Sequence, residues 1–431
     1  MDRAVQDAVA RAMEELGVQG VALGVIDHGE SWTWSGGVTS VENPLPVTDE
    51  TIFQIGSISK TFVATAAMAL VDRGQLDLDA PVVGYVPELR LSSEELTRSV
   101  TMQHLLTHSS GWVGDYFGDT GDGDDALAAF VVKLAKAPQL TPLGSTYSYN
   151  NTAFNLAAHV VARVAGTTYE QAVKDLVLRP LGMRRTFYTA QEAITRRVAI
   201  GHRDGVVQPW RRVRAYNGAG GVLSCVSDLL LYAAFHLGDG SPIMSPESLA
   251  LMQTTARPAG SLCDEVALSW MVDHLAGQRV VHHGGTTNGY MADLRVVRGR
   301  DLAWVLLTNA HHEHQVDRVL LSGLLGDSEA AAPFEPGDLG GFEGHYEAVL
   351  AELEVTVGDG GLVLSVATPA RAQWDRSQEP EAPRSTRLAF RDPDRVIGLD
   401  MPFTGHRGEF LRDPDGHIAW FRWDGRIARR L

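Results

Sequence analysis

Hydrophobic positions at the start of the chain follow a helical spacing and then change to a strand spacing. Val5, Val9, Met13 and Leu16 fall on one stripe of a predicted amphipathic helix. Two β-prone runs follow it, on either side of a turn at residues 27–30. Such runs around a short turn predict a β-hairpin.

The pattern becomes helical again after residue 60 and returns to strands near residue 278. Residues 75–275 contain mostly helical segments and loops, whereas residues 278–309 contain strand-like runs with a turn at 298–301. A last helix is predicted within residues 313–326. Strands at both ends with helices between them predict an α+β fold, in which helices flank one antiparallel sheet and form an all-helical subdomain beside it.

The composition changes again in the stretch "GDSEAAAPFEPGDLGG", where small, acidic, proline and glycine residues replace the apolar periodicity. Short alternating runs separated by turns fill the remaining part of the chain. About eight short strands in this part predict a small antiparallel β-barrel. We therefore predict two domains, residues 1–334 and residues 335–431.

Charge and hydropathy narrow the classes of partner. The 431-residue chain has 53 acidic and 37 basic residues, for a formal net charge of -16. Such a surface repels phosphate backbones and anionic lipids, so we expect neither a nucleic acid nor a membrane as partner. The sequence shows no signal peptide and no apolar run long enough for a membrane span. A cytoplasmic location is the resulting expectation.

The stretch "FQIGSISKTFV" places Ser57 three residues before Lys60, at the start of a long apolar helix. Residues three apart share a helix face, so the hydroxyl and the amine would lie together. A serine becomes a nucleophile when a base takes its proton, and burial near a cation can lower the pKa of a lysine enough for that role. The same residues also fit an ordinary helix N-cap, and the segment alone leaves both interpretations open.

A second candidate is the segment "TYSYNNTAF", in which Tyr149 and Asn151 precede a predicted helix. A phenol near a lysine can relay a proton, and an asparagine within reach can orient a lysine and a substrate amide. In isolation the segment also fits a solvated turn with a packed aromatic side chain.

The third candidate is "VHHGGTTNGY", where His283 on a predicted strand is followed by two glycines. Glycines let a substrate backbone approach closely and add to the sheet. His283 would then be a cationic or hydrogen-bonding wall of the site, and the amide of Thr286 would donate to an oxyanion. A lone strand histidine also fits a structural role, but three such signals in a fixed order are stronger than one.

The three motifs together resemble those of class C β-lactamases, DD-peptidases and related serine hydrolases. Ser-x-x-Lys lies at 57–60, Tyr-Asn-Asn at 149–151 and His-Gly-Gly at 283–285. The flanking segments are also similar to this family over about residues 5–325, including "TMQHLLTHSSGW", "LVLRPLGMRRTFY" and "GAGGVLSCVSDLLLY". The C-terminal strands resemble the lipocalin-like barrel that some cytoplasmic relatives carry.

The resemblance implies a role for each matching residue. Ser57 would be the acylated nucleophile, Lys60 its proton partner and Tyr149 the general acid and base. The amides of Ser57 and Thr286 would form the oxyanion hole, and Asn151 would orient Lys60 and the substrate carbonyl. The implied substrate-binding residues are Asn151, His283, Gly285 and Thr286.

The same resemblance sets the expected function. Histidine stands where the lactamases carry lysine, which favours the peptidase, D-aminopeptidase, cyclase and esterase branches. We expect an acyl-enzyme on Ser57 and cleavage of an amide, ester or thioester of a peptide-like substrate, with preference for a D-amino acid. Alternatives are a penicillin-binding-protein-type thioesterase that cyclises nonribosomal peptides, a carboxylesterase, and a non-catalytic receptor for a β-lactam or peptide.

The expected partner is a small molecule or a peptide, including a carrier-bound peptide. Neither a cofactor nor a metal is expected, because a lysine and a tyrosine supply the proton chemistry. His108 is interpreted as a polar residue that anchors a loop, and Ser109 and Ser110 beside it lack a lysine three residues on. Cys225 and Cys263 are interpreted as small packed side chains.

Overall fold

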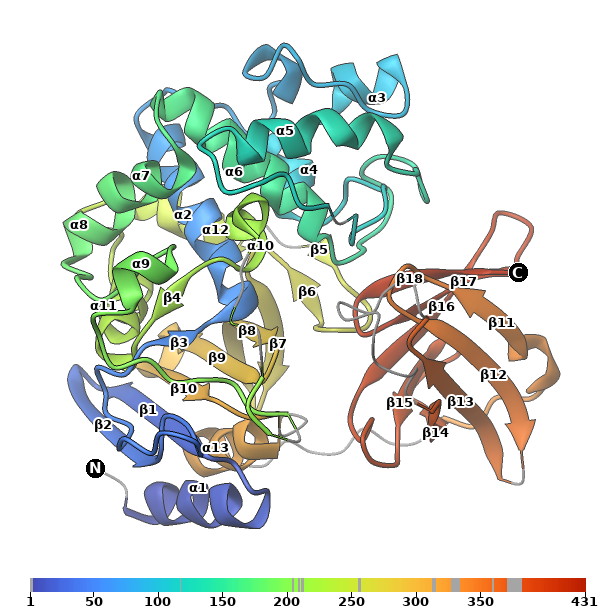
Figure 1. Ribbon diagram of the computed structural model, residues 1–431. Coiled ribbons are helices and arrows are strands. Elements are labelled where there is room, and N and C mark those ends of the chain that lie inside the picture. The colour runs from blue at the N-terminus through green and yellow to red at the C-terminus, as the bar shows by residue number, and fades with distance from the viewer. Residues whose placement is uncertain are drawn as a thin grey trace.

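Strands from both ends of the N-terminal part of the chain pair in one antiparallel sheet (Figure 1). The computed structural model describes residues 3–116, 118–203, 205–207, 210, 213–254, 257–311, 315–326, 334–358, 360–369 and 382–431. The order across the sheet is β2 (Glu30–Gly37), β1 (Gly20–Asp27), β10 (Leu302–Thr308), β9 (Tyr290–Val297), β8 (Gln278–Thr287), β7 (Met271–Leu275), β6 (Glu265–Val266) and β5 (Arg257–Pro258). The predicted α+β fold class is confirmed.

As the sequence pattern predicts, strands from the beginning and from the end of this part of the chain pair with each other in the sheet. β1 pairs with β10 from Val21↔Thr308 to Asp27↔Leu302. The predicted turn at residues 27–30 joins β1 to β2, and β9 and β10 are joined by the turn at residues 298–301. The strands at residues 278–308 and the N-terminal hairpin therefore belong to one sheet.

Helices cover both faces of this sheet. α1 (Arg3–Glu15) and α13 (Gln315–Leu325) pack on one face, where Val5 and Val9 meet Trp304 and Leu320 in a buried cluster. α11 (Val226–Leu237) packs on the other face, and Gly24 gives it room because a Cβ there would lie 2.6 Å from a Val226 methyl carbon. The amphipathic pattern of the first helix accounts for this arrangement.

A helical subdomain stands above the second face of the sheet (Figure 1). Its centre is α2 (Ser59–Asp72), in which every residue from Ser59 to Leu70 is buried. An apolar helix with no polar face requires neighbours all round. The helices packed against α2 include α6 (Asn151–Ala165), α7 (Tyr169–Val173), α10 (Asn217–Gly220) and α12 (Pro246–Thr254). The same part of the chain also contains α3 (Glu94–Ser99), α4 (Met102–Leu106), α5 (Ala126–Lys133), α8 (Arg179–Leu181), α9 (Ala190–Ala193) and the strand pair β3 (Phe53–Gln54) and β4 (Leu223–Ser224).

One part of the sheet was not predicted. We expected residues 75–275 to hold helices and loops, yet β5, β6 and β7 extend the sheet beyond β8. β5 and β6 are two residues long, and β7 is five. Strands this short carry too few alternating positions to give a period-two pattern, which explains why the expectation was wrong there.

The C-terminal strands form a closed antiparallel barrel, as predicted. β11 closes on the last strand through Tyr346↔Arg430. Buried aromatic side chains such as Phe410, Phe421 and Trp423 fill the interior. The strands are β11 (Gly344–Glu347), β12 (Glu352–Gly358), β13 (Gly361–Ala367), β14 (Arg384–Phe390), β15 (Arg395–Gly398), β16 (Arg407–Arg412), β17 (Ile418–Trp423) and β18 (Arg426–Arg430). The predicted domain boundary at 334/335 falls between α13 and β11, and it stays a prediction.

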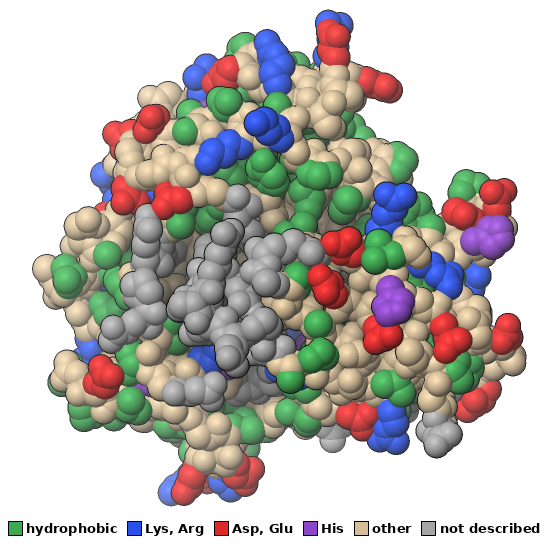
Figure 2. All heavy atoms as spheres, turned by 45° about the vertical axis from the view of Figure 1, so that its right-hand side comes forward, with side chains coloured by type: hydrophobic (Ala, Val, Ile, Leu, Met, Phe, Trp, Pro, Cys, Tyr) green, Lys and Arg blue, Asp and Glu red, His purple; other side chains and the backbone are tan. Residues whose placement is uncertain are grey.

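The barrel docks on the edge of the N-terminal unit through polar contacts. Arg407 donates to Asp264 (3.0 Å) and Asp273 (3.1 Å), and the amide of Gly425 donates to Ser261 Oγ (3.0 Å). These residues lie on or beside β5–β7, so the unpredicted strands form the docking edge. Acidic and basic side chains lie interspersed over both units on the face in Figure 2. None of the helices in the described ranges has the length and apolar character of a membrane span.

Candidate active site

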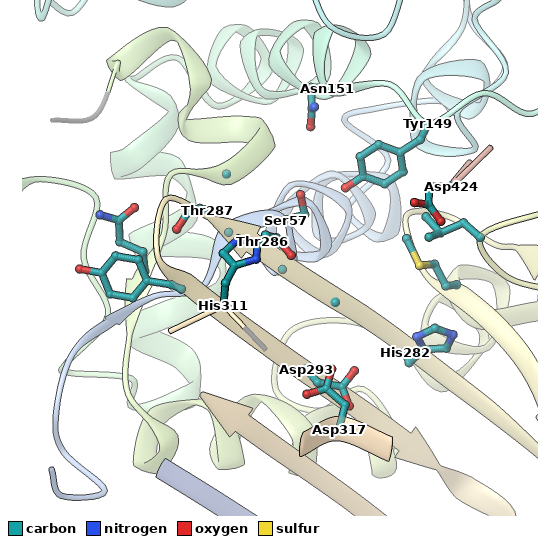
Figure 3. A pocket seen from close by; sticks show the side chains of 18 of the residues that line it. Ser57, Tyr149, Asn151, His282, Thr286, Thr287, Asp293, His311, Asp317 and Asp424 are labelled. Carbon is teal, nitrogen blue, oxygen red and sulfur yellow. The ribbon is translucent and has the colours of Figure 1, made fainter. Parts of the chain in front are cut away.

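A cavity of about 950 Å³ opens where the sheet, the helical subdomain and the barrel meet. Ser57 faces it from one segment, and Tyr149 and Asn151 face it from another (Figure 3). The strand β8 contributes Gly284, Gly285 and Thr286 to the wall, and the barrel contributes Arg426 among other residues. His282 and Asp293 line its far end, on the other side of the β8 strand. The residues of all three sequence motifs therefore meet around one cavity.

Ser57 and Lys60 lie in hydrogen-bond contact, as their spacing predicts. Ser57 belongs to a 3-10 turn (Gly56–Ile58), and Lys60 lies in the first turn of α2. Lys60 Nζ is 3.0 Å from Ser57 Oγ and 2.6 Å from the carbonyl oxygen of Ala219. Lys60 is fully buried, and this burial, reinforced by Arg426, holds its pKa well below the usual value. A neutral amine can accept the hydroxyl proton of the serine.

Ser59, the other serine of the motif, has a structural role. It is fully buried, its hydroxyl donates to the carbonyl oxygen of Gly56 (2.6 Å), and its oxygen accepts from the amide of Val222 (2.9 Å). These bonds tie the start of α2 to the β4 segment. Of the two serines in the motif, only the half-buried Ser57 lines the cavity.

The N-terminal turn of α2 and the edge of β8 approach each other as closely as backbones allow. A Cβ at Gly285 would lie 2.0 Å from the carbonyl oxygen of Ile55 and 3.1 Å from the amide nitrogen of Ser57. A Cβ at Gly56 would lie 2.8 Å from the amide nitrogen of Thr286. The amides of Ser57 and Thr286 are thereby brought to one place, the arrangement an oxyanion hole needs. β7 pairs with β8 only as far as His282, so the edge beyond it is open to a substrate.

Replacing Gly285 with alanine should lower the reactivity of Ser57 toward an acylating probe by about a hundredfold. The added methyl group would collide with the Ile55 carbonyl and separate the two amides. Stopped-flow acylation with a p-nitrophenyl ester measures the effect. Gly284→Ala is the matched control, because a Cβ there meets its nearest atom at 3.8 Å. Equal rate losses in the two variants would contradict this account.

Tyr149 presents its ring to Lys60 Nζ, and its phenol points toward Ser57 (Figure 3). Its ring centroid is 4.8 Å from Lys60 Nζ and 5.0 Å from the guanidinium carbon of Arg426. Burial raises the pKa of the phenol well above its usual value, and a hydrogen bond with Ser57 partly opposes this shift. The phenol therefore stays protonated at neutral pH and can give a proton to a group leaving from Ser57.

Asn151 contacts a carboxylate rather than the lysine. We predicted that it orients Lys60, but its amide nitrogen donates to Asp115 Oδ1 (2.6 Å), and the hydrogen bonds of Lys60 go to Ser57 and Ala219. Asp115 also accepts from Arg426 Nε (2.7 Å), which comes from the barrel. The side chain of Asp115 is only 4% exposed, so this carboxylate needs both partners. Asn151 still lines the cavity, as expected of a substrate-binding residue.

Replacing Arg426 with methionine should slow acylation of Ser57 by roughly ten- to a hundredfold. The buried Asp115 carboxylate would lose its charged partner, and its contacts with Asn151 and the region of Tyr149 would shift. The acylation rate and the melting temperature measure the two effects. Arg429→Met removes the same charge from an exposed position of β18 and should change neither. A wild-type rate in Arg426→Met would refute a role for the barrel in the site.

We predicted His283 as a cationic or hydrogen-bonding wall of the site, and the structure argues against the cationic alternative. Its side chain is fully buried, its Nδ1 donates to the carbonyl oxygen of Gly284 (2.6 Å), and its ring lies 6.3 Å from that of Tyr149. Burial and the nearby Lys60 lower the pKa of His283 to about 3. The imidazole is thus neutral, chiefly because burial disfavours its charged form.

The comparison with known families agrees with this geometry. Residues 5–323 match the profile of the β-lactamase family. The chain belongs to the β-lactamase family. It is 32% identical over 355 residues to penicillin-binding protein 4 of Amycolatopsis lactamdurans, covering 77% of this chain and 93% of that protein. It is 35% identical over 219 residues to esterase EstB of Burkholderia gladioli, covering 47% of this chain and 54% of the esterase.

One solved structure is similar to both units of this β-lactamase-family protein. SurE with D-Leu superposes with a TM-score of 0.78 at 26% identity, over 99% of either chain. The likeness therefore includes the barrel as well as the family domain. Serine hydrolases make up the family, and the relatives include penicillin-binding proteins, β-lactamases and an esterase.

Three contributors to this β-lactamase-family site were not predicted. Asp115 lies in a loop without periodicity, and Arg426 lies in a strand that we interpreted only as part of the barrel. Ala219 acts through its carbonyl oxygen, so its side chain gives no signal. Two sequence signals lay near them: the Asp-Gly turn just before Arg426 marked a hairpin tip, and Ala219 lies in the family-like segment "GAGGVLSCVSDLLLY".

Proposed function

We propose that this protein is a serine hydrolase or acyltransferase that forms an acyl-enzyme on Ser57. Its substrate is an amide, ester or thioester of a small molecule or peptide. The contact between Ser57 Oγ and the buried Lys60 Nζ carries the proposal, because an amine whose pKa is lowered by burial and that lies 3.0 Å from a serine hydroxyl is a base positioned for it.

Acylation uses the groups that meet at the cavity. Ser57 Oγ attacks the substrate carbonyl carbon while its proton passes to Lys60 Nζ, and the amides of Ser57 and Thr286 stabilise the oxyanion. Collapse of the tetrahedral intermediate breaks the bond to the leaving nitrogen, oxygen or sulfur. That atom takes the phenolic proton of Tyr149, and Lys60 returns a proton to the phenolate.

Deacylation repeats these steps with a new nucleophile. Water gives up a proton to the Tyr149 and Lys60 pair, attacks the acyl carbon, and releases a carboxylic acid and free Ser57. An amine in place of water yields an amide, and an amine from the same peptide yields a cyclic product. The open edge of β8 beyond His282 supports a peptide-like substrate, since an extended backbone can pair with it.

The likeness to SurE with D-Leu over both units supports a preference for a D-amino acid beside the scissile bond. Peptide cyclisation is the second candidate function, because an amine of the bound peptide itself can replace water as the nucleophile at the acyl carbon. Esterase EstB supports the simpler carboxylesterase reaction. The competing substrates are D-amino acid p-nitroanilides, peptidyl thioesters and p-nitrophenyl esters, and the ratio of their kcat/KM values separates the three activities.

Covalent labelling tests the proposal. Incubation with a fluorophosphonate or a β-lactam, followed by peptide mass spectrometry, should place the adduct on Ser57. Ser57→Ala should lose the adduct, whereas Ser59→Ala should keep it if folded. A folded wild-type protein that binds these compounds reversibly, without an adduct or product, would be a receptor rather than an enzyme.

A further inference from the structure

His108 holds an unusual place behind the tyrosine of the site. It follows α4 in the stretch "LLTHSSGW", is 1% exposed and has a backbone φ of 54°. A non-glycine residue in this left-handed region is strained unless its surroundings require it. The contacts of His108 show which neighbour benefits from this conformation.

Two hydrogen bonds to His108 flank Tyr149 along the chain. The amide of Ser148 donates to the carbonyl oxygen of His108 (2.9 Å), and the amide of Asn150 donates to its Nδ1 (2.8 Å). One residue thus fixes the backbone on both sides of the tyrosine. The left-handed backbone turns the carbonyl and the side chain of His108 toward the same segment.

The imidazole of His108 also supports the phenol ring itself. The two rings stack with centroids 4.5 Å apart and an interplanar angle of 23°. Phe154 packs against the histidine at 4.8 Å and limits its movement. Nδ1 accepts the Asn150 amide, so the ring proton is on Nε2 and the imidazole is neutral. Burial, with Lys60 and His283 nearby, holds the pKa of His108 well below its usual value.

We infer that His108 is a positioning residue for the proton transfer by Tyr149, with its Nδ1 fixing the backbone and its ring face fixing the phenol. The inference rests on the proposed function of Tyr149. It goes beyond loop anchoring, because it assigns the stacked ring a part in the rate of acylation. A ring that only anchored the loop would affect activity through stability alone.

Two substitutions separate the stack from the hydrogen bond. His108→Asn keeps an acceptor for the Asn150 amide and tolerates the left-handed backbone, but it loses the ring. His108→Phe keeps the ring and loses the acceptor, in a backbone region that disfavours it. We expect His108→Asn to be the more stable and the slower variant. Its kcat for acylation should fall about a hundredfold with KM nearly unchanged, and His108→Phe should stay within about tenfold of wild type.

Ser110→Ala is the matched control in the same loop. It removes the hydrogen bond that Ser110 Oγ accepts from Asn150 Nδ2 (3.1 Å), and this bond does not involve the phenol. This variant should lose thermal stability and acylate within about threefold of the wild-type rate. If His108→Phe does not fold, the comparison of His108→Asn with Ser110→Ala decides the question.

A double-mutant cycle with Tyr149→Phe completes the test. If His108 acts through the phenol, His108→Asn should change the rate little in the Tyr149→Phe background. Additive losses would overturn the inference, and so would a wild-type rate in folded His108→Asn or rates that follow the melting temperatures. Failure of the wild-type protein itself to be labelled at Ser57 would instead count against the proposed function.

Discussion

Lys60→Met should lower the rate of Ser57 acylation by at least about 10⁴-fold, the size of loss seen when the base of a serine nucleophile is removed. Methionine fills the fully buried space of the lysine stem but accepts no proton from Ser57 Oγ. Single-turnover labelling with a fluorophosphonate measures the rate. Lys136→Met, on the exposed surface, is the control and should label as wild type does. Rapid labelling of folded Lys60→Met would refute the assigned role.

The same variant has an effect on stability with a defined pH dependence. The pKa of Lys60 lies well below its usual value of 10.5 in the folded protein. At pH values between the lowered pKa of the folded protein and 10.5, the unfolded chain binds more protons than the native protein. Wild-type stability therefore rises with pH through that window. Lys60→Met lacks this contribution. Its free energy of unfolding relative to wild type should therefore be most favourable at low pH and decrease toward pH 10.5, as urea titrations would measure.

Tyr149→Phe should slow acylation by an amide substrate about 10³-fold, within the range of general acid catalysis. The substitution keeps the ring on His108 and removes only the proton that would go to the leaving nitrogen. Its effect should depend on the leaving group. p-Nitrophenolate departs without protonation, so the loss measured with a p-nitrophenyl ester should be much smaller than the loss with an anilide.

This dependence on the leaving group distinguishes a loss of proton transfer by Tyr149 from a loss of folded protein. Circular dichroism and thermal melting should show a folded Tyr149→Phe protein of nearly wild-type stability, because the phenol is replaced by an isosteric apolar ring in a buried place. Equal losses for anilide and ester would show that the tyrosine does not protonate the leaving group. Tyr147→Phe, whose ring lies beside His108 in the same segment, is the matched control.

Elements with long periodic patterns could be predicted from the sequence. The N-terminal helix and hairpin, the helix that carries Lys60 and the strands of the barrel follow rules of spacing that depend on neighbours in the chain. β5–β7 could not, because they are short and join the sheet through the pairing of β7 with β8. The pattern of neighbouring residues predicts a helix or a strand only when the residues of that element bury enough surface themselves.

The residues of the candidate site can also be divided into those that the sequence predicts and those that it does not. Ser57 and Lys60 could be placed together because a helix turn links them, and the other motifs followed from resemblance. The neutral state of His283 depends on burial and on Lys60, which a sequence pattern does not contain. The contact of Arg426 with Asp115 joins the barrel to the N-terminal part of the chain through a side-chain pair, and such pairs leave no periodic signal.

The hydrogen bond from the Tyr149 amide to the Gly425 carbonyl oxygen (2.7 Å), with the adjacent pair of Arg426 and Asp115, has a consequence during synthesis. Arg426 leaves the ribosome 311 residues after Asp115. At about 5–20 residues per second, this interval lasts roughly 15 to 60 seconds. The nascent chain therefore carries its serine and lysine long before the surroundings of the tyrosine are complete. The hydrogen bonds that the barrel makes to Asp115 and to the Tyr149 backbone can therefore form only once translation has passed residue 426.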